Sequence, residues 1–193
     1  MQLRPDIQIQ SVLKAFTDVI LHALDPANPL AQEQARLCMG HLGVLAARLS
    51  LQYRYDRDEL ERWLALARRI RQEPGAMALA PEAAAALAGL EASADDVLMR
   101  ARAEPQELVD AVRALREATG RLVQQALASD PQGARSRELE REVMQTTKQQ
   151  LLRERSWLAP QGWESDPAVI PPISSLLAPV DGAAVHSTEG AWQ

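Results

Sequence analysis

The feature that most constrains the fold is a change in the character of the chain at Pro160. Up to that residue, apolar side chains recur every three or four positions, which is the spacing of amphipathic helices. Beyond it, residues 161–193 contain no Lys or Arg and carry four prolines. Such a segment can neither propagate a helix nor bury its own apolar groups. The sequence therefore predicts a helical domain over residues 1–158 and an extended or partly disordered arm over residues 159–193.

The composition favours helices packed on helices. Hydrophobic residues make up 47% of the chain and aromatic residues only 4%, so we expect a core of Leu, Val, Ile and Ala. A length of 193 residues is enough for one helical domain of about 150 residues with an appendage. We therefore expect an all-α fold, an up-and-down bundle of four to six helices with an extended, proline-containing C-terminal arm.

Prolines and helix-capping residues divide the domain into periodic segments. These predict helices over residues 5–25, 29–53, 105–129 and 134–158, and another between a connector at 53–57 and Pro74. At the connector, Asp56 with Glu59, or Asp58 with Glu61, can form a capping box. Residues 76–94 are so rich in alanine that a helix is expected, but the face on which it packs is undefined.

The last predicted helix, 134–158, carries only a narrow apolar row on a highly charged cylinder. The row consists of Leu139, Val143, Thr147 and Leu151. A stripe this thin buries little area, and burial contributes about 25 cal/mol per Å². We expect this helix to be peripheral or to be completed by another chain.

The distribution of charge bears on the kind of partner. The formal net charge is −5, and most of it comes from Glu164, Asp166, Asp181 and Glu189 in the arm. The helical domain is thus near neutral, which argues against nucleic acid as a partner. Because the N-terminus lacks a signal-peptide pattern and no run approaches 18 apolar residues, we expect a cytoplasmic protein that does not enter the membrane.

No catalytic or metal-binding motif stands out. The chain has no Gly-x-Ser-x-Gly elbow, no Cys/His pair at plausible spacing and no phosphate-cradling loop. Asp18, His22, Glu33 and His41 could be combined into a metal site, but a di-metal helical bundle needs Glu-x-x-His pairs, which are missing. We expect no catalytic residue, no cofactor and no metal, with an enzyme built from scattered helix residues as an alternative.

The first candidate binding segment contains two glycines in mid-helix, Gly40 and Gly43. Each costs roughly 1 kcal/mol relative to alanine, so something should offset the loss. One explanation is that a neighbouring helix comes close to them, which predicts a buried and tightly packed face. The alternative is that they make room for a ligand or a partner side chain, with Met39 and His41 lining the space.

The second candidate is the connector, which holds both tyrosines of the chain beside two arginines. Tyr53, Arg54, Tyr55 and Arg57 have a composition typical of binding hot spots. This composition predicts a binding surface. The alternative is a well-capped turn between helices with solvated Arg side chains.

The third candidate is the arm. Trp163 is expected to anchor its start, and no second segment of the tail can cover its apolar and proline residues, which include Ile170, Pro171, Pro172, Ile173, Leu176 and Leu177. We expect the arm to dock on a protein partner or on a second copy of this chain. The competing interpretation is that it folds back and fills the groove beside the helix at 134–158.

Five short stretches resemble sequences of a known protein family: QIQSV at 8–12, TDV at 17–19, DPAN at 25–28, LAQEQA at 30–35 and QYRYD at 52–56. Residues 3–70 resemble an uncharacterised family of small helical bacterial proteins associated with gene neighbourhoods that encode aminoglycoside-phosphotransferase-like kinases and acyl-CoA dehydrogenase-like enzymes. The resemblance includes no established catalytic motif, so it assigns no functional residue in this chain. It implies a non-catalytic accessory subunit of a kinase-like phosphotransferase in acyl-CoA or hydroxy-acid catabolism. A homo-oligomer and a small-molecule-binding bundle that uses the space at Gly40 and Gly43 are the alternatives.

Overall fold

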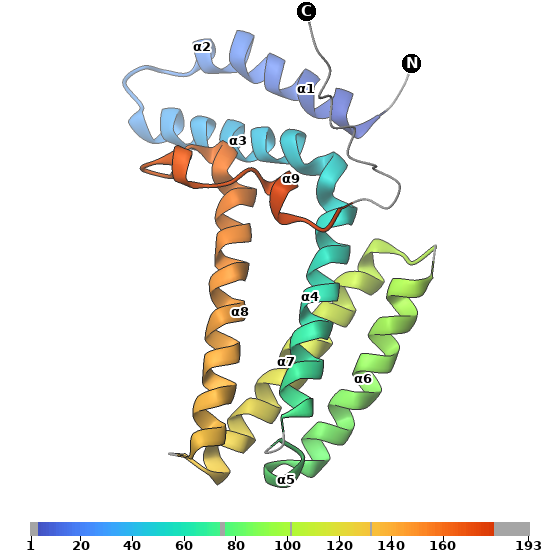
Figure 1. Cartoon of the computed structure of the whole chain (residues 1–193). Coiled ribbons are helices and arrows are strands. Elements are labelled where there is room, and N and C mark those ends of the chain that lie inside the picture. Colours follow the sequence, from blue (N-terminus) through green and yellow to red (C-terminus); the bar gives the residue numbers. More distant parts are fainter. Residues whose placement is uncertain (1–3, 74–75, 101, 132, 180–193) are drawn as a thin grey trace, which may run out of the picture.

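The computed structural model describes residues 4–73, 76–100, 102–131 and 133–179, and within these ranges it contains helices and no strand. The prediction of an all-α bundle is confirmed. Three helices, α4 (Gln52–Gln72), α6 (Pro81–Met99) and α7 (Pro105–Ser129), pack together, with the short α5 (Ala76–Leu79) between α4 and α6 (Figure 1). No helix of the described part is long and apolar enough to cross a lipid bilayer.

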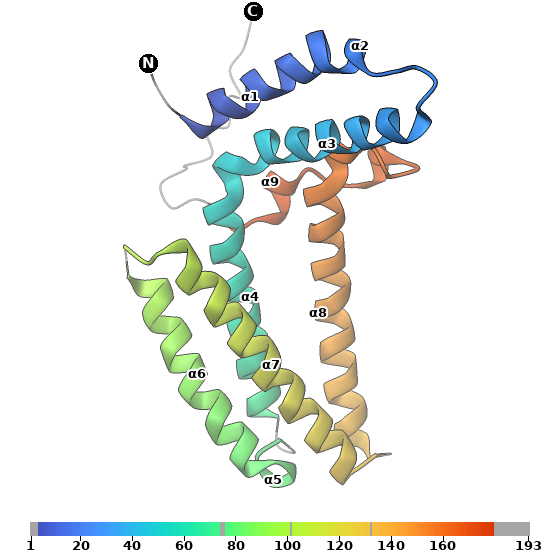
Figure 2. The ribbon, with the colours of Figure 1, turned by 180° about the vertical axis from the view of Figure 1, so that it is seen from behind.

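A helical hairpin lies across one end of the molecule. In it, α1 (Pro5–Ala15) continues through a π-helical turn (Phe16–Ile20) into α2 (Leu21–Ala23), and α3 (Pro29–Arg48) runs back beside α1 (Figures 1 and 2). The start of α3 is the predicted one, because Asn28 Oδ1 accepts a hydrogen bond from the backbone N–H of Ala31 at 3.0 Å. The first two predicted helices therefore form this hairpin.

The boundary between the second and third helices differs from the prediction. The break is a 3₁₀ turn at Leu49–Leu51, after which α4 starts at Gln52 and runs in a new direction (Figure 1). All of residues 53–57 are helical, so the predicted connector and both predicted capping boxes are wrong. The physical reason is that residues 52–58 contain no Gly or Pro, and the positions assigned to a cap are instead held by packing.

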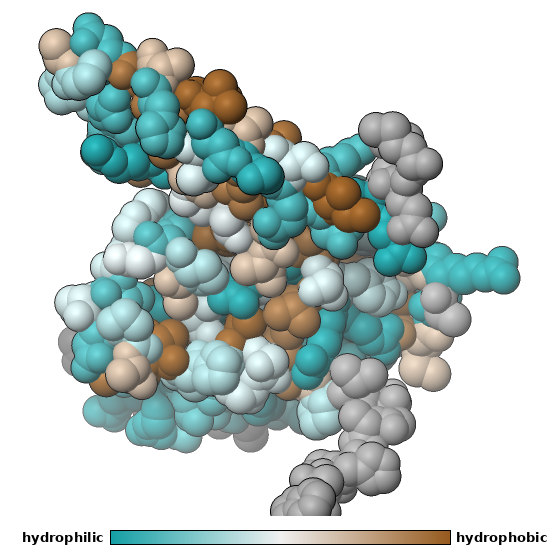
Figure 3. Space-filling model, turned by 90° about the horizontal axis from the view of Figure 1, so that it is seen from above, coloured by the Kyte–Doolittle hydropathy of each residue, from teal (hydrophilic) through white to brown (hydrophobic). Residues whose placement is uncertain are grey.

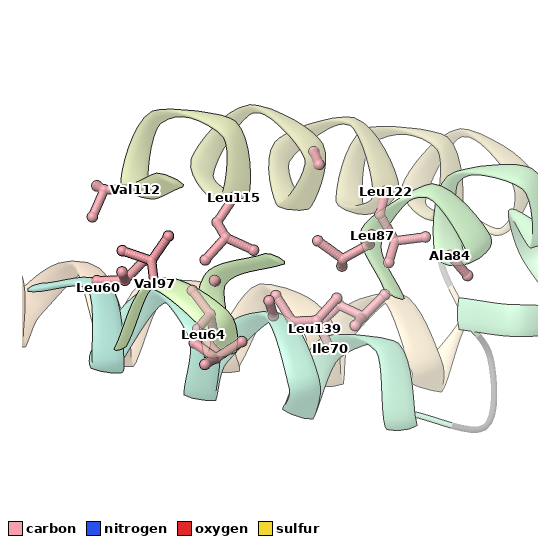
Figure 4. Packing of buried hydrophobic residues seen from close by; sticks show 14 of the residues in the cluster. Leu60, Leu64, Ile70, Ala84, Leu87, Val97, Val112, Leu115, Leu122 and Leu139 are labelled. Carbon is pink, nitrogen blue, oxygen red and sulfur yellow. The ribbon is translucent and has the colours of Figure 1, made fainter. Parts of the chain in front are cut away.

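The main core lies between α4, α6 and α7 (Figure 4). Its largest buried side chains are leucine and isoleucine at helical spacing, namely Leu60, Leu64, Leu66 and Ile70 of α4, Leu87 of α6, and Leu108, Leu115 and Leu122 of α7. The alanine-rich segment has a defined packing face after all, since Ala84 and Ala94 are fully buried in this core. Their small side chains let α6 approach its neighbours closely.

The long helix α8 (Ala134–Leu158) meets α7 at the loop that joins them and extends to the hairpin (Figures 1 and 2). Of its narrow apolar row, Leu139 is buried in the main core, Val143 packs partly against that core, and Leu151 is 54% exposed. Near its other end, α8 buries the polar residues Arg153 and Ser156. It is therefore held at two points rather than along a continuous apolar seam.

Candidate functional site

The α1–α3 hairpin exposes apolar side chains along its length. None of the residues of α1 is buried. The exposed apolar residues, which we call the hairpin surface, are Ile7, Val12, Val19, Ile20, Leu30, Leu45 and Leu49. Figure 3 looks down on the hairpin and shows hydrophobic side chains between the polar ones along it.

The two glycines of α3 lie beside this surface, and the prediction that they are tightly packed is wrong. A Cβ atom built on Gly40 or Gly43 would meet no heavy atom within 4 Å. The structure does bring Gly40 and His41 next to Trp163, with the His41 and Trp163 rings edge to face at 6.4 Å and a cavity of about 210 Å³ between them. Met39 is half-buried. That the glycines leave space for a ligand or partner side chain stays a prediction.

Because Gly43 has open space in front of it, Gly43→Ala is expected to increase the free energy of unfolding by about 0.5–1 kcal/mol. The gain comes from the smaller conformational freedom of alanine in the unfolded chain. Urea denaturation measures it. A clear loss of stability would mean that a backbone does approach this face closely.

The residues of the predicted connector contact the arm. Arg54 donates from Nε and Nη2 to the carbonyl oxygen of Ala178 at 3.1 and 2.6 Å. Tyr55 is buried, and its ring lies 4.3 Å from that of Trp157. Tyr53 and Arg57 line a cavity of about 590 Å³ at the outer edge of the same contact. The second and third candidate segments thus meet in one place.

The arm folds back on its own chain as far as Pro179. Within this range the structure agrees with the competing interpretation, in which the arm packs on its own helices, and not with an arm that extends away to a partner. Ile170, Ile173 and Leu177 are buried, the last two against Tyr55. Pro171 and Leu176 are half-buried, and Pro172 is exposed. Trp163, the expected anchor, is 66% exposed. The rest of the predicted arm, 180–193, lies outside the described residues.

Short helical turns replace the uniformly extended path that the prolines suggested. They are the 3₁₀ turns Ala159–Gln161 and Pro167–Val169 and the one-turn helix α9 (Ile173–Leu176). Apolar side chains of Leu51, Tyr55 and Trp157 form the seat on which α9 lies. These residues come from segments more than a hundred positions apart in the sequence, so no local pattern predicts the seat.

A buried ion pair lies under the arm. The Arg153 Nη2 atom of α8 lies 2.7 Å from Asp58 Oδ2 of α4, and the two side chains are 2% and 5% exposed. Asp58 also accepts hydrogen bonds from Arg62 Nε at 2.8 Å and from the backbone N–H of Ala178 at 2.9 Å. The Arg153 guanidinium lies 4.5 Å from the centre of the Tyr55 ring. One carboxylate therefore connects α4, α8 and the arm.

Sequence reasoning missed this pair because it assigned Asp58 to a cap and Arg153 to a solvated face. A signal was present in the spacing. Positions 139, 143, 146, 150 and 153 follow each other at intervals of three and four, so Arg153 continues the inward row of Leu139. An arginine on such a row is buried only with a charged partner.

Two other carboxyl groups of α4 are partly withdrawn from water. Burial raises the pKa of Asp56, against a hydrogen bond from Gln52 that lowers it. Burial also raises the pKa of Glu59, against the attraction of Arg153 and then Arg116. Both acids line a cavity of about 600 Å³ that contains no hydroxyl, thiol or imidazole among its lining side chains. This lining offers no nucleophile for the carboxylates to activate.

The raised pKa of Asp56 predicts a pH-dependent effect of Asp56→Asn. The Asp56 carboxyl group binds its proton more tightly in the folded chain than in the unfolded chain. Ionisation of this group therefore destabilises the fold at pH values above the pKa of Asp56 in the folded chain. Asp56→Asn should therefore increase the free energy of unfolding at pH 7. The gain should shrink as the pH falls through the raised pKa toward the ordinary value. Urea denaturation at pH 7 and pH 4 measures it, and Asp110→Asn, at an exposed site of α7, should show no such gain.

A further cleft, which the sequence did not indicate, lies between α4, α7 and α8. We call it the α7–α8 cleft; its volume is about 490 Å³. Its lining combines apolar and polar side chains: Trp63, Leu66, Arg116, Thr119, Val123, Gln124, Val143, Thr146, Thr147, Gln150, Leu151 and Glu154, together with Gly120. The cleft exists because α8 touches the bundle mainly at its two ends.

The residues considered for a metal site do not come together. Asp18 pairs with Lys14, at 2.6 Å. In the part of the chain that the structure describes, no group of three or more His, Cys, Asp or Glu side chains could hold a metal ion.

Comparison of the chain with family models, with curated proteins and with solved structures gives no match. The family resemblance of residues 3–70 stays a prediction. Function is therefore argued from the surfaces and clefts described above.

Proposed function

We propose that this protein is a non-catalytic interaction protein that binds a protein partner through its α1–α3 hairpin. The observation that carries the proposal is the hairpin surface, the seven exposed apolar side chains between Ile7 and Leu49. Single exposed apolar residues are normal on a monomer, so the proposal rests on how many of them one hairpin carries. In addition, α1 buries none of its residues, so a partner would supply the packing that this helix lacks.

The charges of the hairpin favour an apolar contact over an electrostatic one. It carries four basic residues, Arg4, Lys14, Arg36 and Arg48, and four acidic residues, Asp6, Asp18, Asp25 and Glu33. Balanced charges give little long-range steering, so affinity would come from apolar burial. A helical face of the partner suits this geometry, because two further helices would complete a four-helix arrangement with α1 and α3.

The resemblance suggests which partner to look for. It covers residues 3–70, which include the whole hairpin, and it implies a kinase-like phosphotransferase of acyl-CoA or hydroxy-acid catabolism. On this proposal the protein is an accessory subunit of that enzyme. A second copy of this chain is the alternative occupant of the same surface.

The test is Val19→Asp combined with Leu45→Asp, which places two charges on the hairpin surface. Each protein is expressed at its natural level, purified and run in size-exclusion chromatography with light scattering. The unmodified chain should elute as a stoichiometric complex and the variant as a free monomer. Circular dichroism should show the same helix content for both. Met99→Asp is the matched control, because Met99 is 85% exposed at the end of α6, outside the hairpin. An unmodified chain that runs as a monomer without a partner would refute the proposal.

A further inference from the structure

We propose that the α7–α8 cleft binds a small zwitterion with an apolar body, of the chemical class of the apolar α-amino acids. This site is separate from the hairpin surface and does not depend on it. The cleft's volume, about 490 Å³, lies within the range of about 300–1,000 Å³ that is usual for small-molecule sites. Its apolar lining comes from Trp63, Leu66, Val123, Val143 and Leu151.

A glycine without a side chain, Gly120, lines part of this cleft and leaves space there. Gly120 lies in the interior of α7, where glycine is unfavourable relative to alanine. A Cβ atom at this position would meet no heavy atom within 4 Å, so close packing within the chain does not require glycine there. Gly120 also lines the cleft, and a larger side chain at 120 would occupy the space that a ligand needs.

A buried hydroxyl group lies in the same wall. Thr119 is 3% exposed, and its Oγ1 atom has no hydrogen-bond partner among the described residues. Threonines in helices usually donate to the carbonyl oxygen four residues earlier, as Thr17 and Thr147 do here at 3.0 and 2.8 Å. Thr119 does not make this bond. Because this Oγ1 atom exposes less than 1 Å² of surface, a polar atom of a ligand would pair with it only after a small movement of side chains in this wall.

The charges at one end of the cleft indicate the polar part of the ligand. Because α8 runs back along α7, Arg116, the first cleft residue of α7, and Glu154, the last cleft residue of α8, belong to the same end of the cleft. Neither has an ion-pair partner within 4.0 Å among the described residues, although Arg116 also faces Glu59 in the neighbouring cavity, whereas nearby Glu117 pairs with Arg121. The Arg116 guanidinium lies 5.3 Å from the centre of the Trp63 ring, and Glu154 accepts a hydrogen bond from Gln150 at 3.0 Å.

A cation and an anion at one end of an apolar cleft match a ligand with both charges. A carboxylate group would pair with Arg116 and an ammonium group with Glu154, while the apolar body lies against Trp63. A simple carboxylic acid would satisfy only the arginine, and a simple amine only the glutamate. The geometry therefore favours the zwitterion over either singly charged molecule.

The test uses three probes of the same shape: L-phenylalanine, 3-phenylpropanoate, which lacks the ammonium group, and 2-phenylethylamine, which lacks the carboxylate. Isothermal titration calorimetry on the full chain should show phenylalanine binding at least about tenfold more tightly than either analogue, since each lost charged hydrogen bond costs about a factor of ten or more. Arg116→Gln should remove the advantage over the amine. Glu154→Gln should remove the advantage over the acid.

Two further variants separate binding from folding. Gly120→Leu should abolish binding of phenylalanine, and Gly89→Leu should leave it unchanged, because Gly89 is also a helical glycine with open space around it but lies on α6 outside the cleft. Thr119→Val should weaken binding without lowering the melting temperature. The proposal is overturned if phenylalanine does not bind, if the three probes bind equally, or if the two leucine variants behave alike. Val19→Asp with Leu45→Asp should not change binding, so this result is independent of the hairpin.

Discussion

Arg153→Met is expected to lower the free energy of unfolding by about 3–5 kcal/mol, because it leaves the Asp58 carboxylate buried without its main cation. Methionine keeps most of the apolar length of the arginine side chain, so the loss reports on charge more than on a cavity. Arg62 still donates to Asp58 and limits the damage, but it is part-exposed and cannot replace a buried partner. Urea denaturation at pH 7 measures the change.

Two variants control this experiment. Arg141→Met removes an arginine from the same helix whose ion pair with Glu138 is exposed to water, and it should change stability by less than about 0.5 kcal/mol. Asp58→Asn added to Arg153→Met should recover part of the loss, because no carboxylate is then left unpaired. If Arg153→Met costs no more than Arg141→Met, the pair does not support the fold.

A chain that ends at Pro160 is expected to unfold at a clearly lower temperature than the full chain while keeping any complex that the hairpin forms. It loses the buried side chains of Ile170, Ile173 and Leu177, each of which contributes about 1.5–3 kcal/mol when fully buried. It also loses the Ala178 N–H that donates to Asp58. The freed arm regains conformational entropy, which offsets part of this cost.

Thermal unfolding followed by circular dichroism measures the difference, and a chain that ends at Pro179 is the control that keeps every described contact of the arm. Ile173→Ala in the full chain should by itself cost about 2–5 kcal/mol. If the chain ending at Pro160 keeps its melting temperature but loses a partner in size-exclusion chromatography, the arm is an interaction element and not part of the fold.

Helix boundaries that depend on nearby residues could be predicted from the sequence. Asn28 caps α3, and Pro105 begins α7, as the sequence predicted. These signals act within about four residues, so they are readable without any knowledge of the fold. The narrow row of α8 was readable for the same reason.

The local signals failed where one residue type serves two purposes. Asp58 near a predicted turn suits a helix cap, but here it accepts from Arg153, a residue 95 positions away in the chain. In the same way, the apolar residues of α1 have the period of a buried face, yet that helix buries none of them. Periodicity predicts that a face is apolar, and only the neighbours in space decide whether it is covered.

What the sequence by itself determined is the all-α class, the apolar faces of the strongly periodic helices and the inability of the proline-containing arm to continue α8. What only the tertiary structure decided is the seat of the arm on Tyr55 and Trp157, the inward position of Arg153, the open face of Gly40 and Gly43, and the cleft beside Thr119. The physical reason is the range of the interactions. Helix formation depends on hydrogen bonds and caps between residues a few positions apart, whereas burial depends on residues that only folding brings together.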